Sequence, residues 1–296
     1  MPRELVISID AMGGDNAPQA IVEGAALSLV RHPKTRFLLH GDHAKLQPLM
    51  VAHPALSKAA EVKHCDDAIG MDEKPGTALR RGRNSSMWRA IESVKAGEAL
   101  SVVSAGNTGA LMAMAKFQLR AIEGLSRPAI AATWPTIRGQ SVVLDVGANI
   151  DQDARQLVDF AILGEAYAKA VFGLDKPLVG ILNVGSEDMK GHEEVKLAAQ
   201  MLKDSGLPIR FHGFIEGHDI SSGTVDVVVT DGFTGNIALK TAEGTARLIG
   251  HYIRSAMQRS LFSKLGYVFS RGAFDTLRQK MDPRAVNGGV FLGLNG

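Results

Sequence analysis

Residues 141–149 read Ser-Val-Val-Leu-Asp-Val-Gly-Ala-Asn. Within this stretch Val142, Val143 and Leu144 are apolar at consecutive positions, which is typical of a strand that is covered on both faces. The apolar run leads into a segment of glycine and small polar residues, where a turn is expected. Residues 227–235 repeat this order, since three valines lead into a segment with two glycines. A buried strand that leads directly into such a loop is typical of α/β proteins.

Short apolar and β-branched runs alternate with helical patterns along the chain. The runs predict strands at residues 5–9, 37–40, 101–104, 141–146, 178–183, 209–212, 225–230 and 290–292. Helices are predicted at residues 17–31, 85–96, 108–121, 153–171, 193–204 and 235–259. We therefore predict a three-layer, Rossmann-like α/β fold in which one mostly parallel sheet has helices on both faces.

The domain organisation follows from length and pattern. The chain has 296 residues without a low-complexity linker or an internal repeat, so we expect one α/β domain over residues 1–296. Between about residues 244 and 283 no strand pattern is found, which predicts a helical hairpin inserted before the last strand. No secretory-signal pattern and no apolar stretch near the ~20 residues of a spanning helix is found, so we expect a cytoplasmic protein.

Composition and missing motifs exclude several classes of function. Lysine and arginine number 33 against 31 acidic residues, a net charge of 33 − 31 = +2, and aromatic residues are only 5%, so we expect no nucleic-acid partner. A single cysteine, Cys65, excludes an internal disulfide and a cysteine-rich zinc site. The nine histidines form no cluster, and we expect no metal. Dinucleotide, P-loop and nucleophile-elbow motifs are absent, which disfavours dehydrogenases, P-loop kinases and α/β-hydrolases.

Five predicted strands end in a loop that combines glycine with small polar residues. These loops begin near residues 10, 104, 145, 183 and 230. Ligands of open α/β sheets bind beyond the carboxyl ends of the strands, and N–H groups at helix starts favour anions. Turn formation explains any one such loop, whereas five at equivalent strand ends indicate an anion-binding site.

Two groups of cations stand out. Lys190 lies beside Gly191 in one of these loops, where it can hold a phosphate as a compact point charge. The positive end of the following helix dipole would disfavour a lysine without such a role. Arg80, Arg81 and Arg83 form either a solvated face or a contact for an acidic partner, and both interpretations remain open.

Six segments in order and spacing carry a resemblance to a known family: residues 10–15, 85–87, 104–112, 145–149, 182–191 and 231–236. Together they resemble the bacterial phosphate acyltransferases of phospholipid synthesis. The resemblance implies transfer of a long-chain acyl group from acyl carrier protein to inorganic phosphate. Members of that family are longer, so we expect a further C-terminal family segment beyond residue 296.

The resemblance also implies roles for the loop residues. We assign Lys190 and Asn236 to catalysis, as donors to phosphate or to the oxyanion that develops on the thioester carbonyl. Phosphate is already an anionic nucleophile, so neither a strong base nor an acyl-enzyme is needed, and we expect no cofactor. Asp10 and Asp231 are expected to orient the loops, because bare carboxylates repel phosphate. The phosphate- or substrate-binding set is Asp10, Gly13, Gly14, Ser104, Asn107, Thr108, Gly147, Asn149, Gly185, Asp231, Gly232, Thr234 and Gly235.

The centre of the predicted hairpin is apolar and flanked by cations, which suits an anionic membrane surface or an acyl chain. A buried hairpin at a dimer interface is the alternative, and both can hold. We therefore expect a homodimer with peripheral membrane contact. The residues assigned to membrane or acyl-chain contact are Leu261, Phe262, Leu265, Val268 and Phe269.

Three other functions are weighed against this one. The first is a phosphate acyltransferase for short acyl-coenzyme A, which would use the same loops. A dehydrogenase of similar layered architecture is weaker, because its fingerprint is missing. A membrane-docked scaffold without activity would explain the hairpin but not five polar strand-end loops.

Overall fold

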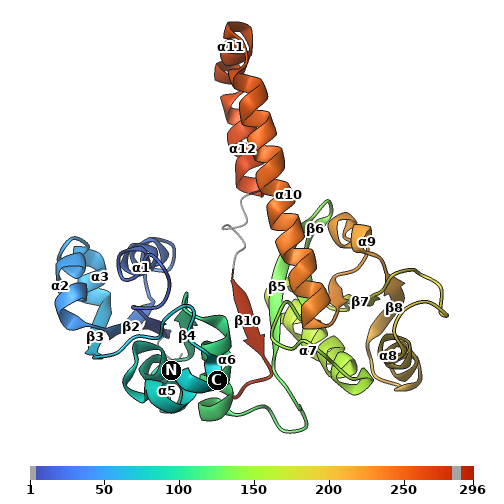
Figure 1. Ribbon diagram of the computed structural model, residues 1–296, viewed down its shortest axis with the longest axis horizontal. Coiled ribbons are helices and arrows are strands. Elements are labelled where there is room, and N and C mark those ends of the chain that lie inside the picture. The colour runs from blue at the N-terminus through green and yellow to red at the C-terminus, as the bar shows by residue number, and fades with distance from the viewer. Residues whose placement is uncertain (1–4, 282–287) are drawn as a thin grey trace. The chain divides into compact units, whose positions relative to one another are not determined.

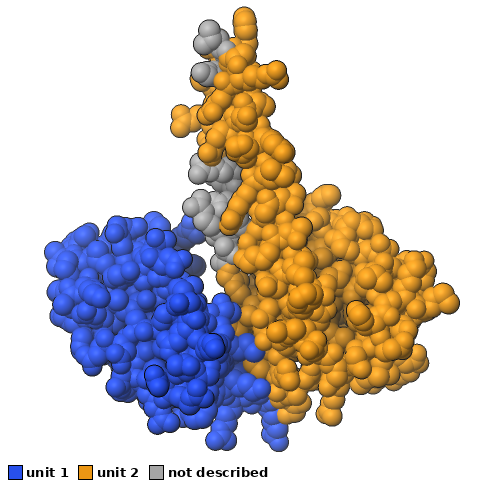
Figure 2. Space-filling view, in the orientation of Figure 1, with its two compact units in different colours: residues 1–123, 294–296 blue, residues 124–293 orange. Residues whose placement is uncertain are grey.

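The computed structural model describes residues 5–281 and 288–296 (Figure 1). The chain divides into two compact units, residues 1–123 with 294–296 (unit 1) and residues 124–293 (unit 2), as Figure 2 shows. Each unit has its own sheet, so the strand-end loops belong to two sheets rather than to the single sheet expected. The single-domain expectation stays a prediction.

Unit 1 contains a parallel sheet of four strands in the order β3-β2-β1-β4. On β2, Leu38 packs into a cluster with α4, α5 and α6, while Phe37 and Leu39 pack into a cluster with α1 and α2. Helices therefore cover both faces of this sheet. The elements of unit 1 are β1 (Val6–Asp10), α1 (Gln19–Arg31), β2 (Arg36–Gly41), α2 (His43–Val51), α3 (Pro54–Ala59), β3 (Ala60–His64), α4 (Pro75–Arg81), the 3-10 helix η1 (Gly82–Asn84), α5 (Ser86–Lys95), β4 (Ser101–Ser104) and α6 (Thr108–Leu119).

Unit 2 contains a mixed sheet of six strands in the order β10-β5-β6-β9-β7-β8. Strands β6, β9, β7 and β8 are parallel, and β5 is antiparallel to both of its neighbours. The elements of unit 2 are β5 (Ala129–Thr136), β6 (Gly139–Leu144), α7 (Ala154–Phe172), β7 (Leu178–Leu182), α8 (Glu193–Asp204), β8 (Arg210–Ile215), α9 (Gly217–Ser222), β9 (Val227–Val229), α10 (Gly232–Gln258), α11 (Leu261–Phe269), α12 (Arg271–Met281) and β10 (Gly289–Leu292).

The consecutive apolar side chains of β6 pack into two different hydrophobic clusters. Val142 and Leu144 pack into the cluster with α7 and α8, whereas Val143 packs with Val228, Ile220 of α9 and residues of α10. Successive side chains of a strand point to opposite faces, so an uninterrupted apolar run requires a helix layer on each side. The three-layer α/β prediction is confirmed for this fold.

Several elements were not predicted, and each lacks a strong local pattern. The edge strand β3 reads Ala-Glu-Val-Lys-His, which has little apolar content. Strand β5 contains Pro135 and three alanines, residue types that are poor in strands, and it forms because Ala129 and Ala131 are buried in the core of unit 2. The missed helices α2, α3, α4 and α9 have nine residues or fewer.

The helices α10 to α12 occupy most of the predicted hairpin, whose last residues, 282 and 283, lie outside the described residues. Helix α10 has 27 residues and is about 40 Å long. It leaves the sheet of unit 2, and α11 lies at its far end (Figure 1). No helix in the described part of the chain combines the length and the apolar character needed to cross a membrane.

Candidate functional site

In unit 1, Asp10 connects the end of β4 with the start of α5. Its carboxylate lies at the C-terminal end of β1 and is 1% exposed. Ser86 Oγ donates a hydrogen bond to Asp10 Oδ1 at 2.5 Å, and Ser104 Oγ donates to Asp10 Oδ2 at 2.7 Å. Ser104 Oγ also accepts from Gly106 N at 3.0 Å. One buried carboxylate thus accepts hydrogen bonds from the start of α5 and from the end of β4.

The loop after β1 approaches this carboxylate so closely that only glycine fits. A Cβ atom on Gly13 would overlap Asp10 Oδ2 and lie 2.9 Å from Gly106 N. Gly14 has a φ of +100°, which favours glycine. Burial raises the pKa of Asp10, and the hydrogen bonds from Ser86 and Ser104 oppose this shift. The structure therefore brings Asp10, Gly13 and Ser104 together.

Asn107 caps helix α6 and is fully engaged. Its Oδ1 accepts from Ala110 N at 3.0 Å, and its Nδ2 donates to the carbonyl oxygens of Met71 and Glu73, both at 2.9 Å. The side chain therefore holds a neighbouring loop in place instead of offering a free donor. Thr108, the first residue of α6, is exposed beside it.

In unit 2, the carboxylate of Asp145 organises the loop after β6. Asp145 is fully buried, and its Oδ1 accepts from Ile130 N and Ala148 N at 3.0 Å each and from Gly147 N at 3.3 Å. Its Oδ2 accepts from the backbone N of Asn149 at 2.8 Å and from Asn149 Nδ2 at 2.9 Å. We expected Gly147 and Asn149 to bind phosphate or substrate. In the structure their backbone N–H groups donate to Asp145 and shape the loop.

The N-terminus of α10 packs directly on this loop. A Cβ atom on Gly232 would overlap the carbonyl oxygen of Asn149, and one on Gly235 would overlap that of Asp145. Asp231 caps the helix, with its Oδ1 accepting from Thr234 N at 2.7 Å. The glycines thus permit the contact, and Asp231 caps the first turn of the helix.

Asn236 lies where α10 packs on the loop after β6, and its side-chain amide has no hydrogen-bond partner among the described residues. A Cβ atom built on Gly147 lies 3.5 Å from both Cβ and Cγ of Asn236, so the Asn236 side chain lies against Gly147. The Asn236 side chain is exposed, and among the described residues it has no hydrogen-bond partner. It is therefore a free donor and acceptor beside a loop that Asp145 holds rigidly.

Lys190 lies in the loop after β7. Its Nζ is 2.8 Å from Glu187 Oε1, and the two side chains are 51% and 55% exposed. This hydrogen bond raises the pKa of Lys190 and lowers that of Glu187, so both groups stay charged at neutral pH. Gly185 allows the close passage of the lysine, since a Cβ atom there would lie 2.5 Å from Lys190 Cδ.

The loops of Lys190, Asn236 and Asp145 follow three neighbouring parallel strands, because β9 lies between β6 and β7. The carboxyl ends of adjacent parallel strands meet at one edge of a sheet, where ligands of α/β proteins bind. The expected site residues thus form two groups, one at the carboxyl edge of each sheet. The unit 1 group is Asp10, Gly13, Gly14, Ser104, Asn107 and Thr108, and the unit 2 group is Gly147, Asn149, Gly185, Lys190, Asp231, Gly232, Thr234, Gly235 and Asn236.

Two organising residues were not among the expected site residues. Asp145 follows a buried strand and precedes glycine and asparagine, an arrangement in which an aspartate often binds its own loop N–H groups, so a local signal was present. Ser86 lies 76 positions from Asp10 in the sequence, and no local pattern could have paired them.

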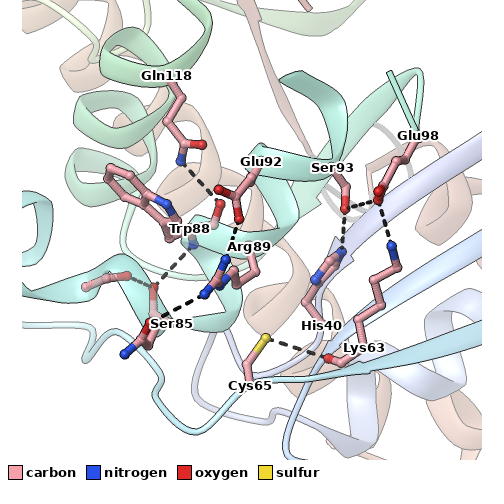
Figure 3. A network of polar contacts seen from close by, with 12 residues as sticks. His40, Lys63, Cys65, Ser85, Trp88, Arg89, Glu92, Ser93, Glu98 and Gln118 are labelled. Carbon is pink, nitrogen blue, oxygen red and sulfur yellow. Dashed lines mark hydrogen bonds and ion pairs between the residues drawn. The ribbon is translucent and has the colours of Figure 1, made fainter. Parts of the chain in front are cut away.

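A second polar network lies in unit 1 and includes the buried side chain of His40 (Figure 3). His40 is the register partner of Asp10 on β2 and is 2% exposed. Its Nε2 lies 3.3 Å from Ser93 Oγ, which donates to Glu98 Oε2 at 3.0 Å, and Lys63 Nζ pairs with the same Glu98 oxygen at 2.6 Å (Figure 3). Burial, and next the charge of Lys63, lower the pKa of His40 to about 4. The histidine is therefore neutral at physiological pH.

Metal-binding clusters are a separate question. Among the residues that the structure describes, no group of three or more His, Cys, Asp or Glu side chains could hold a metal ion.

Known solved structures share this fold. A phosphotransacetylase from Streptococcus pyogenes superposes with a TM-score of 0.62 at 16% identity, covering 83% of each chain. The EutD phosphotransacetylase from Staphylococcus aureus gives a TM-score of 0.57 at 19% identity, covering 84% of this chain and 83% of that one. At such identities the likeness concerns the fold.

The family is shown by sequence. The family model described as "Fatty acid synthesis protein" matches residues 5–296. A phosphate acyltransferase from Parvibaculum lavamentivorans is 59% identical over 297 residues, covering 100% of this chain and 82% of the relative. A phosphate acyltransferase from Rhizobium meliloti is 58% identical over 292 residues, covering 98% and 84%. The chain therefore belongs to the fatty acid synthesis protein family, as a member of its phosphate acyltransferase enzymes.

Proposed function

We propose that this protein transfers a long-chain fatty acyl group from the thioester of acyl carrier protein to inorganic phosphate, giving the acyl phosphate used in glycerophospholipid synthesis. The observation that carries the proposal is the free Asn236 amide beside the loop that Asp145 holds. A rigid loop with one uncommitted donor is suited to stabilise charge that develops on a reacting oxygen.

The reaction is a direct displacement. A phosphate oxygen attacks the thioester carbonyl carbon, and the carbonyl oxygen becomes an oxyanion. When this oxyanion collapses, the C–S bond breaks and the carrier leaves as a thiolate that takes a proton from water. Phosphate is already an anion at neutral pH, so the reaction needs positioning and oxyanion stabilisation more than a base.

Asn236 and Lys190 have different roles in this mechanism. The Asn236 amide donates to the carbonyl oxygen, while Lys190 provides a positive charge for phosphate or for the developing oxyanion. Lys190 is suited to this because it is charged and half-exposed, and because its only ion-pair partner among the described residues is the surface carboxylate of Glu187. Phosphate can displace that carboxylate as the partner of the ammonium group.

We also place the protein in the cytoplasm, as a homodimer in peripheral contact with the membrane. Support comes from α11, where the apolar side chains of Phe262, Val268 and Phe269 are 86%, 65% and 88% exposed. Leu265 on the same helix is 57% exposed, whereas the side chain of Leu261 lies outside the described residues. Such a helix end fits the interface of an anionic bilayer or a long acyl chain.

The homodimer would use the stem of the hairpin. On α10, Leu248, Ile249 and Tyr252 are 49%, 43% and 62% exposed, and they follow helical spacing on one stripe. Sedimentation analysis measures the mass of wild type and Tyr252→Glu. A dimer that dissociates in the variant supports the stem interface, and a wild-type monomer contradicts the homodimer.

Phosphorus NMR tests the reaction. Purified protein is incubated with phosphate and palmitoyl–acyl carrier protein, or with acetyl-coenzyme A. An acyl-phosphate signal with the carrier substrate, together with release of its thiol, is the expected result. A signal with acetyl-coenzyme A alone would support the short-chain reaction, and no signal with either donor would contradict both.

A further inference from the structure

Helices α4 and α6, with η1 between α4 and α5, expose a strongly basic surface in unit 1. We define the basic face as the exposed side chains Arg80, Arg81, Arg83, Lys116 and Arg120. The segments that form it contain no acidic residue, since neither residues 74–91 nor residues 101–122 include an aspartate or glutamate. The whole chain has a net charge near zero, yet positive charge is concentrated in these segments.

Packing in unit 1 brings together the segments that carry these side chains. Helices α4 and α6 contact each other, and a Cβ atom on Gly82 of η1 would lie 2.7 Å from Met114 Cε of α6. The Trp88 and Phe117 rings lie 5.9 Å apart, and Arg83 Cζ lies 5.9 Å from the centre of the Trp88 ring. Arg83 and the α6 residues are therefore neighbours across this aromatic pair.

The charges of the basic face are not compensated within the protein. Among the described residues, Arg80, Arg81 and Lys116 take part in no ion pair, whereas Arg89 nearby pairs with Glu92 at 2.7 Å. Like charges that share a surface repel one another, so the arrangement does not stabilise the folded chain by itself. Such a surface is suited to bind an acidic partner.

We propose that the basic face docks an acidic protein and, resting on the proposed function, that this protein is the acyl carrier protein that delivers the thioester. Phe117, 58% exposed among the cations, supplies an aromatic anchor of the kind that protein interfaces favour. Exposed apolar side chains suited to lipid gather on α11, while this face is dominated by charge. Its chemistry therefore favours a protein over a membrane.

Helix α6 connects the basic face to the unit 1 group of candidate site residues. Its N-cap Asn107 follows the loop of Ser104, which is bonded to Asp10, while Lys116 lies in its last turn. Twelve residues of helix span about 18 Å. A carrier docked on the basic face therefore lies about one helix length from the unit 1 group, a distance that a thioester on a long flexible arm can span.

The test measures docking without catalysis. Fluorescence anisotropy follows the binding of labelled, unacylated acyl carrier protein to wild type and to Arg80→Glu/Arg81→Glu/Lys116→Glu. We expect a Kd at least tenfold higher for the variant, and a wild-type Kd that rises steeply with salt. Arg31→Glu/Lys34→Glu/Lys58→Glu makes the same change of charge at exposed positions elsewhere in unit 1 and is expected to bind like wild type.

The outcomes separate docking from the reaction. Equal binding by wild type and the basic-face variant, or no binding by wild type, overturns the docking proposal. If the variant binds the carrier as tightly as wild type but no longer binds phosphatidylglycerol vesicles that wild type binds, the face is a lipid contact and the proposal is wrong. Carrier binding without acyl phosphate in the NMR assay contradicts the proposed function and leaves docking supported. If melting shows that the reversed variant is unfolded, Arg80→Ala/Arg81→Ala/Lys116→Ala decides by the same measurement, with a weaker expected loss.

Discussion

Asn236 is the side chain whose role is tested most directly by substitution. Its amide has no partner among the described residues and is exposed, so Asn236→Ala removes no internal hydrogen bond. We expect kcat to fall by about 10²–10³, as for the loss of one oxyanion donor, with an unchanged melting temperature. Lys240→Ala, an exposed change one turn further along α10, is the control and is expected to keep its turnover. Full activity of Asn236→Ala would refute the role.

Lys190 is expected to act on phosphate through its charge. Because its Nζ is shared with Glu187, removal of the carboxylate should leave the ammonium free for phosphate. We expect Lys190→Met to lower kcat/KM for phosphate by at least tenfold. Glu187→Gln is expected to have a KM for phosphate equal to or lower than that of wild type. Steady-state kinetics with varied phosphate measures both, and an unchanged kcat/KM in Lys190→Met contradicts the assignment.

His40 makes the stability of the protein depend on pH. Its native pKa of about 4 lies below its ordinary value of 6.5, so the unfolded chain takes up a proton before the native state does. Native stability is therefore lost as pH falls from about 6.5 towards 4, by about 2 to 3 kcal/mol at pH 4.5. Urea unfolding at pH 7 and pH 4.5 measures this loss.

The histidine contribution is isolated by comparison of variants. We expect His40→Gln to show a smaller loss between the two pH values than wild type. His43→Gln changes an exposed histidine three positions further along the chain, at the start of α2, and is expected to keep the wild-type loss. An identical pH dependence in His40→Gln and wild type would show that other groups are responsible.

At the scale of the element, two of the four glycines of α10 have opposite requirements. A Cβ atom on Gly232 would overlap the carbonyl oxygen of Asn149, whereas one on Gly244 meets nothing within 4 Å. We expect Gly232→Ala to destabilise the protein by roughly 2 kcal/mol or more and to reduce turnover, because the helix must move away from the loop. Gly244→Ala is expected to stabilise by about 0.5–1 kcal/mol. Thermal melting measures both, and similar shifts in the two variants would contradict the close packing.

Local patterns predicted some elements to the residue and missed others. Strand β4 (Ser101–Ser104) and helix α8 (Glu193–Asp204) were predicted with their observed bounds, since apolar runs and amphipathic spacing are both local. Strand β5 was missed because its alanines become strand residues only through burial against β6 and α7. Propensity is a weak guide wherever tertiary packing decides the conformation.

In the candidate site, too, some features were predictable from local sequence and others were not. The loop residues were predicted because each follows a strand in the sequence, as Gly13 follows β1 and Asp231 follows β9. Contacts across the chain were not, since the bond of Ser86 to Asp10 spans 76 positions. The inward direction of the Gly147 and Asn149 N–H groups depends on the fully buried Asp145 carboxylate, which a pattern of residue types does not reveal.

At the scale of the whole molecule, we expect α11 to control the contact with lipid. Liposome flotation with phosphatidylglycerol and phosphatidylethanolamine vesicles compares wild type with Phe262→Glu/Leu265→Glu. We expect the variant to lose at least tenfold in vesicle affinity, because two exposed apolar side chains become charged and repel an anionic surface. Val30→Glu/Ile137→Glu alters side chains that are 81% and 88% exposed outside the hairpin and is expected to float like wild type. Equal flotation of all three proteins removes the membrane assignment.

The division into two sheets was not expected because no change in composition marks it. The chain passes from unit 1 to unit 2 between Glu123 and Gly124 and returns between Gly293 and Leu294. The second crossing has no proline, serine or charged residue nearby, and the residues of these kinds at the first, Glu123, Ser126, Arg127 and Pro128, form a stretch no longer than an ordinary loop between a helix and a strand. Domain number is a property of long-range contacts, which such a short connection does not report.

The return of residues 294–296 to unit 1 has a consequence for synthesis on the ribosome. Leu294 packs against the core of unit 1, Gly296 approaches Leu119 and Val94, and Asn295 donates to the carbonyl oxygens of Arg120 and Ala121. Unit 1 is translated first, yet these contacts form only after all of unit 2 has been translated. About 170 residues of later chain must therefore be synthesised before the nascent N-terminal unit can make these contacts.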